Sequence, residues 1–374
     1  WREIIRHLSV RQGFFGNDLV NSGPKLINSL TRFNSMGRLP HVSVSLKDVA
    51  KAAEVSVGTV SNTLNKPEMV APATLIRVQK AIKELGFVPN GFARHLRSGY
   101  SRTLGLVVPD VSNPFFTDVA RGVEDAASKR DYAVFLCNTD ESPEKEGRYI
   151  NVLIEQHVRG VLITPTDHKA ETLQALENRK ISVALLDREI ENENHCSVSV
   201  DDSHGGQMAI EYLASLGHKN IAWVSGPESI PQVADRALGV RKAAKLANVN
   251  IETLKVSLMN ASKGEEAARE LLALKQRPTA VFCANDLLAL GMMRELINQD
   301  IRIPEDVALM GYDDIQFAPS AAIPLSSISQ PAYQIGVTAA DLILDECESG
   351  EIHKHQQIKF QPRLVERAST KKKV

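Results

Sequence analysis

Polar residues that can bind a small molecule stand where several apolar segments of the chain end. Acidic or amide residues follow LGLVVP, GVLITPT, AVFCA and VALMGY, and an arginine lies in the helical stretch after IAWVSGP. Carboxylates accept from neighbouring hydroxyls, a guanidinium donates as a fork, and an aromatic ring can stack on a sugar face. These residue types together predict a site for a sugar-like ligand. The candidates are Asp110, Phe116, Asp167, Arg236, Asn285 and Asp313.

A structural role for each of these strand-end residues is the alternative. An Asp or Asn at such a position can cap the following helix, because its side chain accepts from free backbone amides. The residues alone leave both interpretations open, and we interpret Asp286, which follows Asn285, as a cap.

A second group of candidate residues lies in three short helical segments near the N-terminus. In SLKDVAKAAE the apolar residues recur at helical spacing, with Ser45 as N-cap and Asp48 as its N3 acid. A second helix is expected in VGTVSNTLN, and a third that starts near Pro72 should end at Gly86. The tight turn between the first two is typical of a helix-turn-helix, whose second helix enters the DNA major groove. The residues at its start are Ser56, Val57, Gly58, Ser61 and Asn62.

Hydroxyls and amides at these positions can bond bases or phosphates, and Val57 can contact a thymine methyl. The alternative is a three-helix bundle that contacts another protein. The connector FVPNGFARHLRSGYSRT supports DNA binding, because Arg94 and Arg97 can lie near phosphates while Leu96 inserts between base steps of the minor groove. A plain solvated linker is the alternative for this segment.

Charge is distributed unevenly along the chain. Residues 41–102 hold nine Lys and Arg against four Asp and Glu, whereas residues 103–374 hold 29 against 39. A basic head on an acidic body suits a protein of which one end approaches phosphates.

The elements that position the ligand-binding candidates alternate between strands and helices. Apolar strands such as TLGLVVPD, SVALLDR and VALMGYDD are separated by amphipathic stretches, which predicts α/β lobes with doubly wound parallel sheets behind an all-α head. We expect two such lobes, because there are too many strands for one small sheet. The predicted division begins with a poorly ordered N-terminal extension at 1–43, which need not belong to the natural start. A helix-turn-helix at 44–90, a hinge at 91–102, a core at 103–368 and a basic tail at 369–374 follow. Within the core, we expect one lobe at about 103–187 with 330–347 and the other at about 188–329 with 348–368.

Composition and motifs exclude several classes of protein. No apolar run is long enough to cross a bilayer and no signal peptide opens the chain, so we expect a cytoplasmic protein without membrane contact. Four dispersed cysteines without a C-x-x-C pair indicate neither a disulfide framework nor a zinc site. We interpret His353 and His355, with Cys347, as exposed tail residues, and metal binding is the alternative for these three. Because P-loop, nucleophile-elbow, dinucleotide-binding and H-E-x-x-H motifs are missing, we expect neither an enzyme nor a cofactor.

The segments SLKDVAKAAEVSVGTVSNTLNKP and GFVPNGFARHLRSGYSRTLGLVVPDVSNPFF closely resemble the start of the lactose-repressor and galactose-repressor family. The likeness extends over residues 44–368 through LGHKNIAWVSGP, ADRALGVRKA, FCANDLLALG, VALMGYDDI and SSISQP. The resemblance implies a repressor with a core like a periplasmic sugar-binding protein, in which an effector alters how hinge helices sit on a near-palindromic DNA operator. It also implies at least a dimer, and we expect a homodimer because no heptad segment follows Gln361.

The resemblance also assigns roles by position. It implies phosphate contacts from Ser45, Lys47, Asn65, Thr74 and Asn90, and a minor-groove wedge at Leu96 with Ala93 on the same face. It favours Arg236, Asn285 and Asp313 as effector contacts and adds Gln330 to the weaker candidates. Many relatives have an arginine where this chain has Asn62, so the operator sequence stays open.

The absence of a Lys and Arg cluster at the strand ends favours a monosaccharide or nucleoside over a phosphorylated ligand. The identity of the effector, the sign of its action and the use of a corepressor protein stay open. A sugar-binding receptor without a DNA-binding role is the alternative function.

Overall fold

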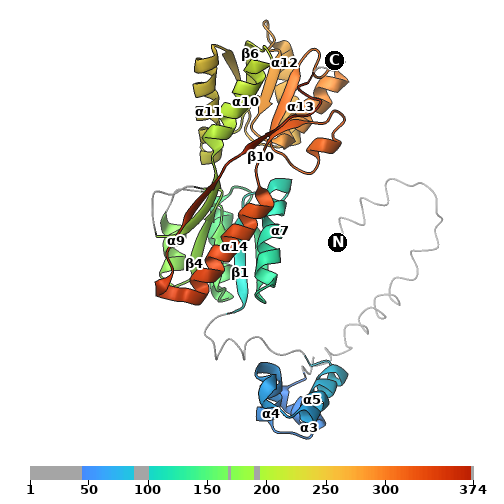
Figure 1. Cartoon of the computed structure of the whole chain (residues 1–374), viewed down its shortest axis with the longest axis vertical. Helices are drawn as coiled ribbons and strands as arrows, with labels where there is room; N and C mark the ends of the chain where they lie inside the picture. The colour runs from blue at the N-terminus through green and yellow to red at the C-terminus, as the bar shows by residue number, and fades with distance from the viewer. Residues whose placement is uncertain (1–43, 88–100, 167–169, 189–193, 372–374) are drawn as a thin grey trace, which may run out of the picture. The chain divides into compact units, whose positions relative to one another are not determined.

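The computed structural model describes residues 44–87, 101–166, 170–188 and 194–371 (Figure 1). The chain divides into two compact units, residues 1–91 and 92–374, which we describe separately. The predicted extension and four predicted site residues, Asn90, Ala93, Leu96 and Asp167, lie outside the described residues. Within the described ranges, every helix is too short or too polar to cross a membrane.

The first unit contains the three helices expected from the sequence. They are α3 (Leu46–Ala52), α4 (Val57–Asn65) and α5 (Pro72–Leu85), with a 3-10 turn, η1 (Pro67–Met69), before the last. The reciprocal capping box of Ser45 and Asp48 starts α3, and Gly86 ends α5 in a left-handed conformation at φ 61°. Val49, Val60 and Val78 are fully buried and hold the three helices together.

The second unit consists of two lobes, each built on a six-stranded sheet. In the first lobe the strand order is β11-β5-β4-β3-β1-β2, and all neighbouring strands are parallel. These strands are β1 (Thr103–Val108), β2 (Ala133–Asn138), β3 (Gly160–Ile163), β4 (Ser182–Leu186), β5 (Cys196–Val200) and β11 (Gln357–Phe360). One apolar cluster joins the sheet to α7 (Pro114–Ser128) and α14 (Ala332–Ser349), and another joins it to α8 (Pro143–Glu155) and α9 (Ala170–Glu177). Both faces are therefore covered, as the apolar strands predict.

The second lobe repeats this arrangement with one antiparallel edge. Its order is β12-β10-β9-β8-β6-β7, and β12 pairs antiparallel with β10. The strands are β6 (Asn220–Ser225), β7 (Asn250–Lys255), β8 (Ala280–Cys283), β9 (Ala308–Asp313), β10 (Ser326–Ser329) and β12 (Arg363–Val365). The helices α10 (Asp202–Ser215) and α11 (Pro231–Ala247) pack together, as do α12 (Ala261–Ala273) and α13 (Asp286–Asn298). The short turn η2 (Ala318–Ser320) also lies in this lobe, whereas η3 (Gly350–Ile352) follows α14 in the first lobe.

The chain crosses between the lobes three times, after β5, after β10 and after β11. The predicted boundaries at 187/188 and 347/348 are wrong at two of these crossings, because β5 and β11 belong to the sheet of the first lobe. The strand β5 pairs with β4, which directly precedes it in the chain, and β11 pairs with β5, which lies more than 150 residues before it. The parallel strands of both lobes end toward the region between the lobes, where such sheets bind ligands.

Candidate ligand pocket and nucleic-acid surface

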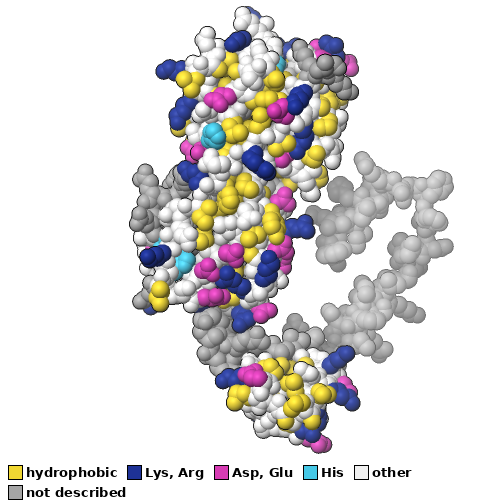
Figure 2. Space-filling model, in the orientation of Figure 1, with side chains coloured by type: hydrophobic (Ala, Val, Ile, Leu, Met, Phe, Trp, Pro, Cys, Tyr) yellow, Lys and Arg dark blue, Asp and Glu magenta, His cyan; other side chains and the backbone are white. Residues whose placement is uncertain are grey.

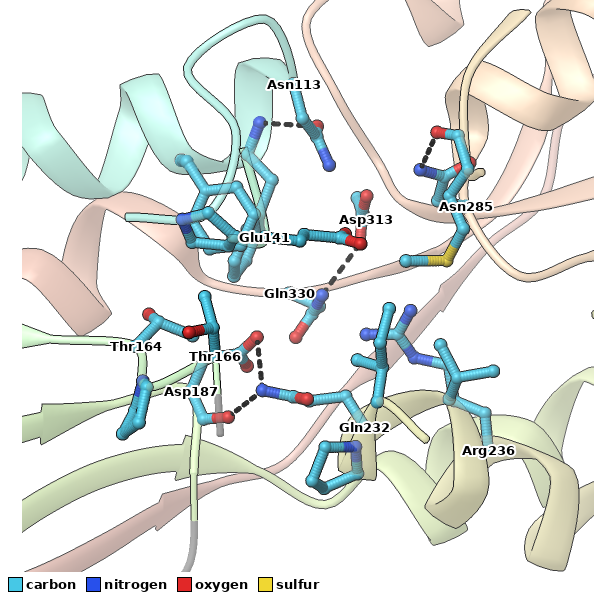
Figure 3. A pocket seen from close by; sticks show the side chains of 18 of the residues that line it. Asn113, Glu141, Thr164, Thr166, Asp187, Gln232, Arg236, Asn285, Asp313 and Gln330 are labelled. Carbon is cyan, nitrogen blue, oxygen red and sulfur yellow. Dashed lines mark hydrogen bonds between the residues drawn. The ribbon is translucent and has the colours of Figure 1, made fainter. Parts of the chain in front are cut away.

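A cavity of about 320 Å³ lies at the carboxyl ends of the strands of both lobes. Thr164, Thr166 and Asp187 follow strands of the first lobe and face Arg236 and Asn285 of the second lobe (Figure 3). The volume is near the lower end of the ~300–1,000 Å³ range of small-molecule sites. A compact ligand held by both lobes fits this space.

Three buried oxygen atoms in the lining have no hydrogen-bond partner among the described residues. They are Oγ1 of Thr164, Oδ1 of Asp187 and Oε1 of Gln330. A buried acceptor without a partner costs roughly 1–3 kcal/mol. The pocket is therefore prepared for a ligand that brings several hydrogen-bond donors.

Two amide side chains tie the acids of the pocket to neighbouring elements. Gln232, at the start of α11, donates to Oδ2 of Asp187 at 3.2 Å and so joins the second lobe to the first. Gln330 Nε2 donates to Oδ1 of Asp313 at 2.8 Å (Figure 3). These bonds orient the carboxylates and leave an oxygen of Asp187 and one of Gln330 for a ligand.

Arg236 projects from α11 and is 5% exposed. Its Nε donates to Asp202 at 2.6 Å, its Nη1 donates to the carbonyl of Ala284 at 2.8 Å, and its guanidinium lies 3.8 Å from the centre of the Tyr312 ring. The Tyr312 hydroxyl donates to the same Asp202 oxygen. A guanidinium has five N–H donors, so these bonds fix its direction and still leave donors for a ligand.

Close packing of α10 against α11 supports this placement. A Cβ at Gly206 would overlap the carbonyl oxygen of Arg236, and one at Gly239 would overlap that of Ser203. Only glycine allows the two backbones to approach this closely. The helix that carries Arg236 is thereby held against the helix that carries Asp202.

Burial makes the charged forms of the pocket acids costly. Desolvation raises the pKa of Asp313 to about 6, although Arg236 and hydrogen bonds from Gln330 and Asn113 act in the opposite direction. Desolvation, with the nearby Asp202, also raises the pKa of Asp187 well above its usual range. Asp313 adopts φ 103°, a backbone conformation that favours glycine, and such strain concentrates at functional sites.

The structure brings together five of the residues predicted to bind a ligand: Phe116, Arg236, Asn285, Asp313 and Gln330 all line the cavity. Asn285 is also the N-cap of α13, where its side chain accepts from Leu288 N. Asn285 therefore caps a helix and also lines the pocket, so its capping role does not exclude the predicted contact with a ligand.

Two strand-end aspartates differ from their predicted places. Asp110 does not line the cavity among the described residues, because its carboxylate accepts from the backbone and hydroxyl of Ser112. The interpretation of Asp286 as a cap is wrong: Asn285 caps α13, and fully buried Asp286 accepts from Ile315 N and Ser327 Oγ. Asp286 therefore joins α13 to the segment after β9 and to the strand β10.

The sequence interpretation missed several polar residues of the lining. They are Asn113, Glu141, Thr164, Thr166, Asp187 and Gln232. Thr164 and Asp187 follow apolar strands, so the rule that found Asp313 could also have found them. Gln232 gave no signal, because it lies near the start of a helix rather than at a strand end.

The first unit presents its predicted DNA contacts at the start of α4. Val57 is 43% exposed although it is apolar, and Gly58 and Asn62 are exposed beside it. Ser56 caps the helix, with its Oγ accepting from Thr59 N, and Ser61 is half-buried. An exposed apolar residue between small polar ones suits the edges of bases.

The residues predicted to contact phosphates lie on three different elements of this unit. Ser45 caps α3, exposed Lys47 follows in its first turn, and Thr74 is half-buried in the first turn of α5. Asn65 is exposed at the end of α4, where its Nδ2 donates to the Ser61 carbonyl at 2.7 Å. Lys and Arg side chains lie at several places around this small unit in the space-filling view (Figure 2).

Both units match models of known families. Residues 45–90 match the model of bacterial regulatory proteins of the lacI family, and residues 101–366 match that of periplasmic binding proteins and the sugar binding domain of the LacI family. The transcriptional repressor PurR of Vibrio cholerae is 36% identical over 332 residues, which cover 87% of this chain and 98% of that protein. PurR of Aliivibrio fischeri is 33% identical over 330 residues, with the same coverage.

Solved structures are similar in fold. A transcriptional regulator CelR in complex with cellobiose is 32% identical with a TM-score of 0.65, covering 87% of this chain and 99% of that one. A LacI family regulator from Enterococcus faecium with bound ribose is 30% identical with a TM-score of 0.67, covering 72% and 98%. The lac repressor dimer bound to operator is 25% identical with a TM-score of 0.78, covering 87% and 99%.

Proposed function

The chain belongs to the LacI family of bacterial regulatory proteins, and from that premise we propose that it is a DNA-binding transcriptional repressor controlled by a small sugar-like effector. The regulated genes would serve the use of a carbohydrate or a nucleoside. The repressor would act in the cytoplasm as a homodimer on a near-palindromic operator. This role requires binding and conformational change but no chemical reaction.

The set of unpartnered buried acceptors in the pocket carries the proposal for the effector. One buried oxygen each of Thr164, Asp187 and Gln330 accepts no hydrogen bond from the described residues. A sugar supplies several hydroxyl donors in a compact shape. Phe115 and Phe116, whose rings meet edge to face at 5.0 Å, line the same cavity and offer an apolar surface to a sugar ring. Ribose and cellobiose in the two related structures are ligands of this kind.

A neutral effector is favoured over a phosphorylated one. Arg236 is the one basic side chain among the described residues of the lining, and it already serves Asp202, whereas Glu141, Asp187 and Asp313 are acidic. A phosphate group would be repelled by these acids and would lack free cations to bind. We therefore expect a monosaccharide or nucleoside, with Arg236, Asn285, Asp313, Gln330 and Phe116 as contacts and Asp167 as an additional one.

For DNA binding, we propose that the start of α4 reads the major groove through Ser56, Val57, Gly58, Ser61 and Asn62. Phosphate contacts would come from Ser45, Lys47, Asn65, Thr74 and Asn90, and Leu96 with Ala93 would enter the minor groove. One helix-turn-helix reads a half-site, so a dimer is required to read a palindrome. The edge strand β2 exposes Phe135 (46%) and Leu136 (49%), a pair of apolar side chains suited to the dimer interface.

Calorimetric titration with a pentose, a hexose, a nucleoside and a sugar phosphate tests the effector class. Tight binding of one neutral compound supports the proposal, and tight binding confined to the sugar phosphate would refute it. Gel shifts with DNA from upstream of neighbouring genes test the regulatory role. Sequence-selective, salt-sensitive binding that changes with the effector supports it, whereas a sugar receptor without a DNA-binding role would show neither.

A further inference from the structure

Four potential metal ligands meet at one end of the first lobe, away from the effector pocket. They are the thiol of Cys196, the carboxylate of Glu346 and the imidazoles of His353 and His355, whose ligand atoms all lie within 4.8 Å of one another. We propose that these four side chains form a zinc-binding site. The site belongs to no part of the effector or DNA-binding machinery described above.

The distances are close to those that a tetrahedral zinc ion requires. Cys196 Sγ lies 3.1 Å from His353 Nε2 and 3.8 Å from His355 Nδ1, and His355 Nδ1 lies 3.7 Å from Glu346 Oε2. Bonds of about 2.3 Å to sulfur and about 2.0–2.2 Å to nitrogen and oxygen place tetrahedral ligand atoms about 3.4–3.6 Å apart. Small side-chain rotations would therefore complete the coordination shell.

An unpartnered buried atom supports a missing ion at this place. Oε2 of Glu346 accepts no hydrogen bond from the described residues, because His355 Nδ1 lies 3.7 Å away, beyond hydrogen-bond distance, and the Glu346 side chain is 16% exposed. A buried carboxylate is costly unless it is paired or coordinates a metal. Zinc with one thiolate, one carboxylate and two neutral imidazoles has no net charge, which suits a partly buried site.

The ligand types select zinc among the common divalent ions. Thiolate and imidazole are ligands for zinc and other late transition metals, whereas magnesium and calcium prefer oxygen. Four protein ligands leave no open coordination position, so the site would be structural rather than catalytic.

The placement of the ligands explains what the ion would hold together. Cys196 opens β5, Glu346 lies near the end of α14, and the two histidines precede β11 on an extended segment where alternate residues face the same side. These three elements are also the ones in the first lobe that adjoin the three crossings between the lobes. In Figure 1, α14 runs along the length of this lobe. The short turn η3 follows α14 in the chain and directly precedes His353.

The proposal revises the sequence interpretation of these histidines as exposed tail residues. Both are half-buried, and the thiol beside them comes from Cys196, which lies far away in sequence, rather than from Cys347. Ligands more than 150 positions apart give no motif in a sequence.

Metal titration of the full chain tests the site. After bound metal has been removed with a chelator and Zn²⁺ has been added back, we expect one Zn²⁺ per chain by elemental analysis. Co²⁺ should give the intense visible bands of tetrahedral coordination and a thiolate-to-cobalt charge-transfer band, and Mg²⁺ should not compete. The unmodified chain suffices for this measurement. Weak binding of several ions, or a Co²⁺ spectrum without the thiolate band, would overturn the proposal.

Matched variants identify the ligands. Cys196→Ser and His353→Gln should weaken zinc binding more than ~100-fold, because even residues that only support ligands contribute about 10–100-fold. Cys347→Ser removes a buried thiol whose Sγ instead donates to the Arg159 carbonyl, and His218→Gln removes an imidazole of the second lobe. Both controls should keep full affinity, and zinc should raise the unfolding temperature of the controls but not of Cys196→Ser. Equal loss of affinity in Cys347→Ser and Cys196→Ser would refute the assignment.

Discussion

Replacing Asp313 with asparagine should make the protein more stable at neutral pH while weakening its hold on the effector. The pKa of Asp313 is about 6 in the folded protein against the usual 3.8, chiefly because the carboxylate is desolvated. The folded state therefore binds the proton more tightly than the unfolded state does. The stability that Asp313 contributes through this proton is fully present below about pH 4 and is lost as the pH rises to about 6. Above that value the free energy of unfolding stays reduced by this amount.

The size of the effect follows from the same two values. One pKa unit corresponds to about 1.36 kcal/mol, so ionised Asp313 costs the folded state about 3 kcal/mol at pH 7.5. Asp313→Asn keeps the shape and the oxygen that accepts from Gln330 but carries no charge. Its free energy of unfolding should exceed that of the parent by up to about 3 kcal/mol at pH 7.5, and the difference should vanish near pH 4.

Effector binding should change in the opposite direction. A hydrogen bond to a charged group contributes about 1.5–3 kcal/mol and one between neutral groups about 0.5–1.5 kcal/mol, so the neutral side chain should weaken sugar binding about 5- to 10-fold at pH 7.5. Urea unfolding at several pH values and calorimetry measure the two effects. Asp300→Asn, at an exposed site of the second lobe, is the control and should change neither. Equal stability of Asp313→Asn and the parent at both pH values, or unchanged affinity, would refute the reasoning.

Three further predictions concern the other parts of the protein. Arg236→Met should reduce the free energy of unfolding by about 3–5 kcal/mol in urea titrations and abolish effector binding, because it leaves buried Asp202 without its cation; a stable variant that still binds sugar would contradict this. Asn62→Ala should weaken the free energy of binding to the operator by about 1–3 kcal/mol but should change binding to random DNA little. Lys47→Ala should weaken binding to both DNAs in gel shifts and should lower the slope of the salt dependence by about one ion. Equal losses on both DNAs for both variants would disprove the assigned roles. Leu136→Asp should dissociate the dimer in light scattering, while Leu246→Asp, a 78% exposed site in the second lobe, should not.

Local signals in the sequence predicted most of the elements. The Ser45 and Asp48 box, the cap at Ser56 and the glycine at Gly86 act through their nearest neighbours, so three helix boundaries could be read directly. Apolar strands such as β1 and β9 are buried along almost their whole length and stand out for the same reason. The strand β7 gives no such signal, because it lies at a sheet edge with only Leu254 buried, so its residues show no apolar run.

Features that depend on long-range pairing could not be predicted. The lobe to which β11 belongs is decided by hydrogen bonds to β5, a strand far away in sequence, whereas β5 joins the first lobe through β4, the strand directly before it. The same limit applies to Asp286, whose partners Ile315 and Ser327 come from other elements, and to the contact of Gln232 with Asp187 across the lobes. A strand-end rule identifies which residues can reach the cleft but not which of them another side chain already uses.

The unfavourable features of the pocket also explain how a small ligand could control the two lobes. Oxygens of Asp187 and Thr164 on the first lobe and of Gln330 at the crossing into it lack partners when the lobes meet around the cavity. At roughly 1–3 kcal/mol for each such atom, three of them cost about 3–9 kcal/mol. A ligand must favour one state by about 5.5 kcal/mol to change a 1:99 equilibrium into 99:1. Donors of a sugar that satisfy these atoms therefore provide free energy of the same order as this shift of the lobes requires. An analogue that lacks the matching hydroxyls should bind without switching DNA affinity.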